Sequence, residues 1–140
     1  MTQTEFAEIL GVSFTTVSRW EKGINSIFLN DKYIIAFNEE WIEQANQLEI
    51  QVTCFHESRH AFQWKVINSE YTGTEVVDSL TIQKWSDEMS NYNSPTKKDI
   101  PEEEYLKQAI EIDAIAFAHK MMLEHFGVKT VIPECIKNNI

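Results

Sequence analysis

The chain has 140 residues, 43% of them hydrophobic, which is enough for one compact domain with a core and too few for two full domains. Its formal net charge of −10 excludes nucleic-acid binding through overall charge, so DNA binding would need a local basic patch. The sequence predicts no membrane span and no secretory signal, and its two cysteines, Cys54 and Cys135, favour a reducing cytoplasm over a disulfide framework.

Residues 1–23 predict two short helices, set apart from a domain that spans residues 24–140. Gly11 ends the first helix, and Ser13 caps the second, which Gly23 ends. Apolar residues recur at helical spacing in both segments. Two such helices cannot bury their apolar faces alone, so we expect them to pack on the rest of the protein or on a second copy in a homodimer.

The next segment has a different pattern. Residues 26–37 hold two β-rich runs around Asn30-Asp31, which predicts a β-hairpin. Helical spacing then returns, and Gly127 closes the last helix. We expect an α+β fold, mostly helical, with a small antiparallel sheet. The expected helices are 48–67, 77–89 and 101–126, separated by loops at 68–75 and 91–101.

Residues 54–63, CFHESRHAFQ, hold the strongest chemical signal. His56 and His60 lie one turn apart on a helix, so both imidazoles can bind one metal ion at about 2.0–2.1 Å. Glu57 lies beside that face, where its carboxylate reaches a water rather than the metal, as a general base does. The alternative is an ordinary amphipathic helix with two surface histidines.

A catalytic zinc site needs a third protein ligand, and the stretch EIDAIAFAHKMM at 111–122 offers one. Glu111 shares its helical face with Ala114 and Ala118, whose small side chains let a neighbouring helix approach closely. Asp113 lies about 200° further round the helix, so the two carboxylates cannot both face the metal. We favour Glu111 and keep Asp113 as the alternative.

These two motifs resemble those of the ImmA/IrrE family of zinc metallopeptidases, which pair HExxH with E-x-x-A-x-x-F-A. The resemblance covers about residues 24–126, and it implies a minimal zincin-like, gluzincin-like fold and a bound Zn²⁺. It also implies a short sheet beside the HExxH helix, which the 26–37 hairpin could supply. It implies His56, His60 and Glu111 as ligands and Glu57 as the base. It also implies a protein or peptide substrate, such as the repressor of a mobile element.

The chain departs from that family at two places. The family usually reads HELGH, whereas Ser58 and Arg59 fill the middle of the motif here. The second motif is usually followed by Leu-Leu-Met-Pro, and this chain has His119-Lys-Met-Met122. Both departures leave the implied ligands intact and change their surroundings.

The stretch TQTEFAEILGVSFTTVSRWEKG resembles the second and recognition helices of Xre/Cro-type helix-turn-helix repressors. The resemblance covers about 22 residues and lacks the family's first and closing helices. We therefore favour a remnant used for packing or dimerisation, and expect no DNA partner. The positions that match the family's DNA contacts are Gln3, Ser13, Thr15, Thr16 and Arg19.

Three functions follow from these patterns. The first is a zinc metallopeptidase, the second a DNA-binding regulator with a structural or vestigial metal site, and the third an inactive zinc-binding interaction module. The donor that would stabilise the oxyanion stays open among Tyr105, Arg59, His119 and His125. Arg59 is otherwise expected in a salt bridge at the helix surface, and Cys54 as a buried thiol.

Overall fold

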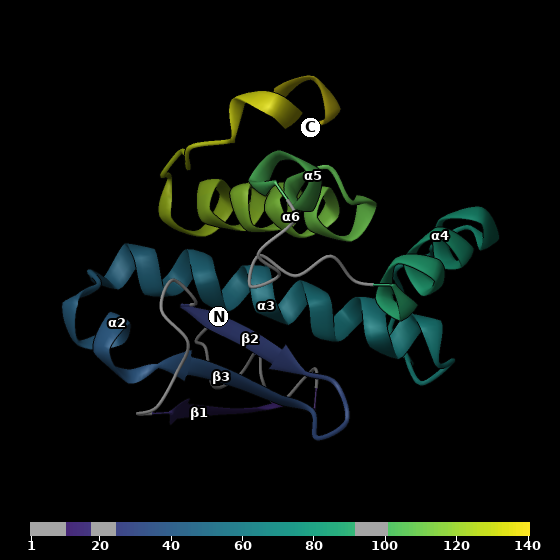
Figure 1. The fold of residues 1–140 in the computed structure, drawn as a ribbon, viewed down its shortest axis with the longest axis horizontal. Helices are drawn as coiled ribbons and strands as arrows, with labels where there is room; N and C mark the ends of the chain where they lie inside the picture. Colours follow the sequence, from purple (N-terminus) through teal and green to yellow (C-terminus); the bar gives the residue numbers. More distant parts are fainter. Residues whose placement is uncertain (1–10, 18–24, 92–100) are drawn as a thin grey trace.

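The computed structural model describes residues 11–17, 25–91 and 101–140, and it shows the predicted α+β fold, mostly helical with one small sheet (Figure 1). The strands are β1 Ser13–Val17, β2 Ser26–Leu29 and β3 Ile34–Asn38. The helices are α2 Glu39–Gln44, α3 Gln47–Ile67, α4 Ser79–Ser90, α5 Glu102–Leu106 and α6 Ala109–Phe126, and the 3₁₀ helix η1 Glu134–Asn139 follows.

The sheet contains the predicted hairpin and one strand more. β2 and β3 pair antiparallel, and β1 pairs with β3 parallel, so the strand order is β1-β3-β2. The central strand β3 buries Ile35, Ala36 and Phe37, as a strand paired on both sides can. The sheet is therefore mixed, whereas the sequence predicted an antiparallel hairpin alone.

The prediction of a helix from Ser13 onward is wrong for residues 13–17, which form β1. Three of the five residues in SFTTV are β-branched, and such residues fit a pleated sheet better than a helix. The ring of Phe14 stacks on that of Phe37 with centroids 5.9 Å apart, so strand pairing also buries an aromatic contact. The rest of the predicted helix pair, residues 1–10 and 18–23, lies outside the described residues.

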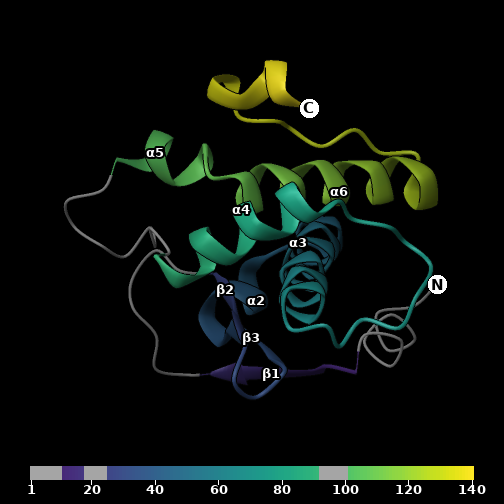
Figure 2. The same ribbon diagram turned by 90° about the vertical axis from the view of Figure 1, so that its right-hand side faces the viewer.

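Helix α3 lies between the sheet and α6 (Figures 1 and 2). Gln63, near the end of α3, bonds to Ile110 at the start of α6, whereas Phe55 packs against Phe117 further along it. The two helices are therefore antiparallel. Figure 2 looks almost along α3, with α6 on one side of it and the sheet on the other.

The predicted helix 48–67 is confirmed as α3, and its first turn is capped by the side chain of Asn46, which accepts from the N–H of Glu49. The predicted helix 77–89 is confirmed as α4, with slightly different ends. None of the helices in the described ranges is long and apolar enough to cross a membrane.

The predicted helix 101–126 is two helices, α5 and α6, because the backbone of Gln108 is extended. The carboxylate of Glu88, on α4, accepts from the N–H groups of Ala109 and Ile110 at 2.9 Å each. These groups open α6 and would otherwise lack partners within it, so a contact from another helix fixes where α6 begins. Gly127, with φ 64°, ends α6 as predicted.

Candidate metal centre

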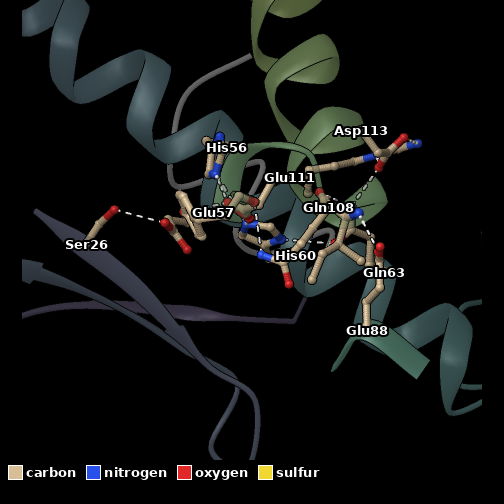
Figure 3. Close-up of polar contacts among 12 residues, drawn as sticks. Ser26, His56, Glu57, His60, Gln63, Glu88, Gln108, Glu111 and Asp113 are labelled. Atoms are coloured by element: carbon tan, nitrogen blue, oxygen red, sulfur yellow. Dashed lines mark hydrogen bonds and ion pairs between the residues drawn. The ribbon is translucent and has the colours of Figure 1, made fainter. Parts of the chain in front are cut away.

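Three predicted ligand side chains meet between α3 and α6 (Figure 3). The Nε2 atoms of His56 and His60 lie 3.2 Å apart. One carboxylate oxygen of Glu111 lies 3.3 Å from His56 Nε2, and the other lies 2.8 Å from His60 Nε2. The structure thus brings together residues separated by up to 55 positions in the sequence.

These distances fit one shared ion. Two donor atoms that each lie about 2.0–2.1 Å from a tetrahedral zinc are about 3.3–3.4 Å apart. The His56–His60 and His56–Glu111 distances are close to this value. Two imidazoles and one carboxylate are also a donor set of catalytic zinc sites, which leave a fourth position open. The His56 side chain is 20% exposed, so the site is accessible from that side.

The buried Glu111 carboxylate and the imidazoles stabilise each other's charged forms. Burial opposes ionisation of Glu111, whose side chain is fully buried, but His60 and His56 hold the pKa of its carboxyl well below the usual value. Burial likewise opposes a charged His60, but the Glu111 carboxylate raises the pKa of His60 to about 10. A bound metal ion would take the place of the proton on Nε2.

Glu57 lies next to this cluster on α3 and is bonded to the sheet. The hydroxyl of Ser26, on β2, donates to Glu57 Oε1 at 3.0 Å (Figure 3). The Glu57 carboxylate is therefore held by the hairpin and is not part of the three-ligand group. Sequence reasoning missed Ser26, because a serine that opens a strand carries no sign of a helix 31 residues away.

Tyr105, one of the candidate oxyanion donors, has its hydroxyl in the cluster, where it donates to Glu111 Oε1 at 2.6 Å. The other candidates have different partners. His119 Nδ1 lies 2.8 Å from the Thr130 hydroxyl, and the ring of His125 stacks on Phe55.

Arg59, the fourth candidate, makes two salt bridges. Its guanidinium donates to Asp113 at 2.7 Å and to Glu75 at 2.8 Å, and it lies over the ring of Phe62, 4.1 Å from the centroid. The predicted salt bridge is confirmed, but Arg59 is buried rather than on the surface. Asp113, the alternative third ligand, is turned toward Arg59 and away from His56, as the helical geometry predicted.

Gln63 is a further residue that sequence reasoning missed. Its side chain is fully buried, and its Oε1 lies 2.9 Å from His60 Nδ1, the ring nitrogen that faces away from Glu111. Cys54 is buried as predicted, and burial together with the charge of Glu57 raises the pKa of its thiol to about 12.

The positions that match DNA contacts are only partly described. Ser13, Thr15 and Thr16 lie on β1 with exposed side chains, and Gln3 and Arg19 lie outside the described residues. In β1 the three described side chains are presented by a strand that pairs with β3.

Residues 1–27 match a helix-turn-helix family model. This covers less than a fifth of the chain, and the matched segment includes the residues that form β1. No curated protein and no solved structure matches the chain.

Proposed function

We propose that the chain is a zinc-dependent metallopeptidase of the ImmA/IrrE type, in which His56, His60 and Glu111 hold the ion and Glu57 is the general base. The observation that carries the proposal is the convergence of two imidazole nitrogens and one carboxylate from two helices, with separations of 2.8–3.3 Å. The choice of zinc rests on this donor set and on the resemblance of the two motifs to that family.

A bound zinc ion would lower the pKa of a water to about 7 and polarise the carbonyl of the scissile bond. Glu57 would accept the proton of the attacking water and donate it to the leaving amine. Ser26 fixes the carboxylate of Glu57 by its hydrogen bond. Tyr105 is the best-placed donor for the oxyanion, because its hydroxyl already lies against Glu111.

The strand β2 supports an extended peptide as the substrate. It is at an edge of the described sheet, it begins at Ser26, and it packs against α3. A peptide that pairs with β2 by β-augmentation would pass close to Glu57, the proposed base. A regulatory protein in the cytoplasm, such as a mobile-element repressor, is proposed as the substrate on the family resemblance alone.

Metal analysis of the purified protein, combined with a cleavage assay on a mixture of proteome-derived peptides, tests the proposal. We expect about one zinc per chain in the wild type, none in His56→Ala, and an unchanged zinc content in Glu57→Gln. New peptide termini should appear with the wild type and be absent with Glu57→Gln. Lack of zinc in the wild type, or cleavage by Glu57→Gln, would overturn it; zinc without cleavage would indicate the inactive binding module.

The match of residues 1–27 favours a second candidate, a DNA-binding regulator. It predicts that the protein selects a sequence from a random DNA library, with salt-sensitive affinity that falls in Arg19→Ala. The net charge of −10 opposes it. Absence of binding above the nonspecific level at moderate salt would remove this candidate.

A further inference from the structure

The side-chain amide of Gln63 lies fully buried between α3 and α6, where it contacts three polar groups. Its Nε2 is 3.0 Å from the carbonyl oxygen of Ile110 and 2.8 Å from Asp113 Oδ2. Its Oε1 is 2.9 Å from His60 Nδ1. The amide therefore connects a ring nitrogen of one proposed ligand to the backbone and a side chain of α6 (Figure 3).

The two groups on α6 decide which way the amide points. A backbone carbonyl can only accept, and a carboxylate oxygen that faces a guanidinium accepts as well. Both oxygens of Asp113 are acceptors here, because the Arg59 guanidinium donates to each of them, at 2.7 and 3.2 Å. A flipped amide would place the oxygen of this fully buried side chain against two acceptors, so the NH₂ group must face α6.

This orientation determines the proton on His60. Because Gln63 presents its oxygen to His60 Nδ1, that nitrogen must carry the hydrogen and donate it. The other nitrogen, Nε2, then faces Glu111 and His56 and has its lone pair available for a metal once its own proton is released. A hydrogen bond of this kind also fixes the rotation of the imidazole ring.

We propose that Gln63 is a positioning residue of the metal site: it holds His60 with the hydrogen on Nδ1 and presents Nε2 to the ion. The inference rests on the metal binding in the proposed function and adds how the ligand is oriented. Asp113 and Arg59 take part indirectly. Arg59 and Gln63, which both donate to Asp113, lie four residues apart on α3. The ion pair between Arg59 and Asp113 therefore orients the amide of Gln63.

The carboxylate of Glu75 extends this arrangement to the loop before α4. It accepts from both terminal nitrogens of Arg59, at 3.1 and 2.8 Å. Arg59 is thus held at two sides, and its Nε and Nη2 remain directed at Asp113. Arg59, which departs from the family's usual HELGH motif, therefore supports the orientation of His60 through Asp113 and Gln63.

The test replaces Gln63 by methionine, which has a similar length and no hydrogen-bonding amide. The matched control is Gln83→Met, at an exposed glutamine of α4 that bonds only to the nearby Asp87 in the described contacts. Zinc affinity is measured by competition with a chelator, and nitrogen-detected NMR of the imidazoles identifies which ring nitrogen of His60 carries hydrogen, with and without zinc. Loss of an outer-shell partner of a metal ligand typically lowers affinity about 10–100-fold.

We expect a slowly exchanging Nδ1–H signal of His60 in the wild type, both metal-free and zinc-loaded. Gln63→Met should lose that protection and bind zinc about 10–100-fold more weakly, while Gln83→Met behaves as the wild type. Zinc affinity of Gln63→Met within twofold of the wild type, or coordination of wild-type His60 through Nδ1, would overturn the inference.

The NMR measurement also separates the two proposals. If Gln63→Met does not fold, the wild-type Nδ1–H signal still decides, because it needs no variant. If the wild type binds no zinc, the proposed function fails, and the metal-free protein alone then tests the hydrogen bond. A metal-free His60 without protected Nδ1–H would contradict the role of Gln63 whether or not zinc binds.

Discussion

Helix α3 packs against the sheet on one side and against α6 on the other, and the two interfaces differ in chemistry. Toward the sheet, Cys54 and Ala61 belong to an apolar cluster with Ile35 and Phe37. Toward α6, Phe55 packs with Ala118 and Met122, and next to this apolar contact buried or half-buried polar side chains meet in pairs at hydrogen-bonding distance. These side chains are His56, Arg59, His60, Gln63, Glu111 and Asp113.

The difference separates stability from geometry. Apolar contacts are non-directional and their contribution follows the area that is buried. Hydrogen bonds and ion pairs between helices require specific distances, and a buried polar network in which each member is satisfied fixes those distances. The apolar contacts on both sides therefore hold α3 in place, and the polar contacts toward α6 determine where the imidazoles and carboxylates point.

The largest effect expected from this comparison is the loss of metal in Glu111→Ala. Removing the fully buried carboxylate takes away one of three ligands, and zinc affinity should fall by more than about 100-fold. Asp113→Ala leaves all three ligands in place and should bind zinc with a smaller loss, about 10-fold or less, through Gln63. Chelator competition measures both.

The opposite pattern would reassign the ligand. Zinc retained in Glu111→Ala and lost in Asp113→Ala would make Asp113 the third ligand. Circular dichroism of each metal-free variant provides the control, because a change in folding must not be read as a change in the metal site.

The second effect concerns the ion pairs of the polar interface. Arg59→Met should lower the free energy of unfolding by about 2–3 kcal/mol, because Asp113 and Glu75 lose the cation that pairs with both. The cost is below that of a fully buried pair, since Glu75 is 46% exposed. Urea denaturation measures it, with Lys84→Met as the control: Lys84 is 64% exposed, and its loss should cost less than about 0.5 kcal/mol. A similar cost for both variants would refute a buried role for Arg59.

The polar interface was predictable in part. The spacing of His56 and His60 and the alanines beside Glu111 were enough to predict which side chains meet, because each pattern repeats along one helix. Gln63 and Ser26 carried no such pattern. Each contacts the site through a neighbouring element, and a single sequence does not give the register between elements.

Helix ends and strands were less predictable for a related reason. The break before α6 is set by Glu88, which lies on another helix. At residues 13–17, Gly11 and Ser13 favoured a helix, whereas the β-branched residues favoured a strand, and pairing with β3 decided between them. A local pattern therefore determines structure where no tertiary contact opposes it.

The third effect comes from a polar group on the apolar side. Ser58 shares the helical stripe of Cys54 and Ala61, is fully buried, and its hydroxyl has no hydrogen-bond partner among the described residues. Ser58→Ala removes an unsatisfied hydroxyl and should raise the free energy of unfolding by about 1 kcal/mol. Ser90→Ala, at an exposed position of α4, controls for the helix propensity gained. An equal gain in both variants would mean that the Ser58 hydroxyl is satisfied.

The smallest effect tests the strand β1, which completes the sheet side. Thr15 is exposed on β1, so Thr15→Ala should lower the free energy of unfolding by about 0.5 kcal/mol, because alanine fits a pleated strand poorly. A helix at the same position, as the helix-turn-helix similarity favours, would give the opposite sign, because alanine is the better helix former by up to about 0.7 kcal/mol. Thr53→Ala on α3 is the matched control and should be stabilising. Opposite signs for the two threonines in urea denaturation would place Thr15 in a strand, and equal signs would place it in a helix.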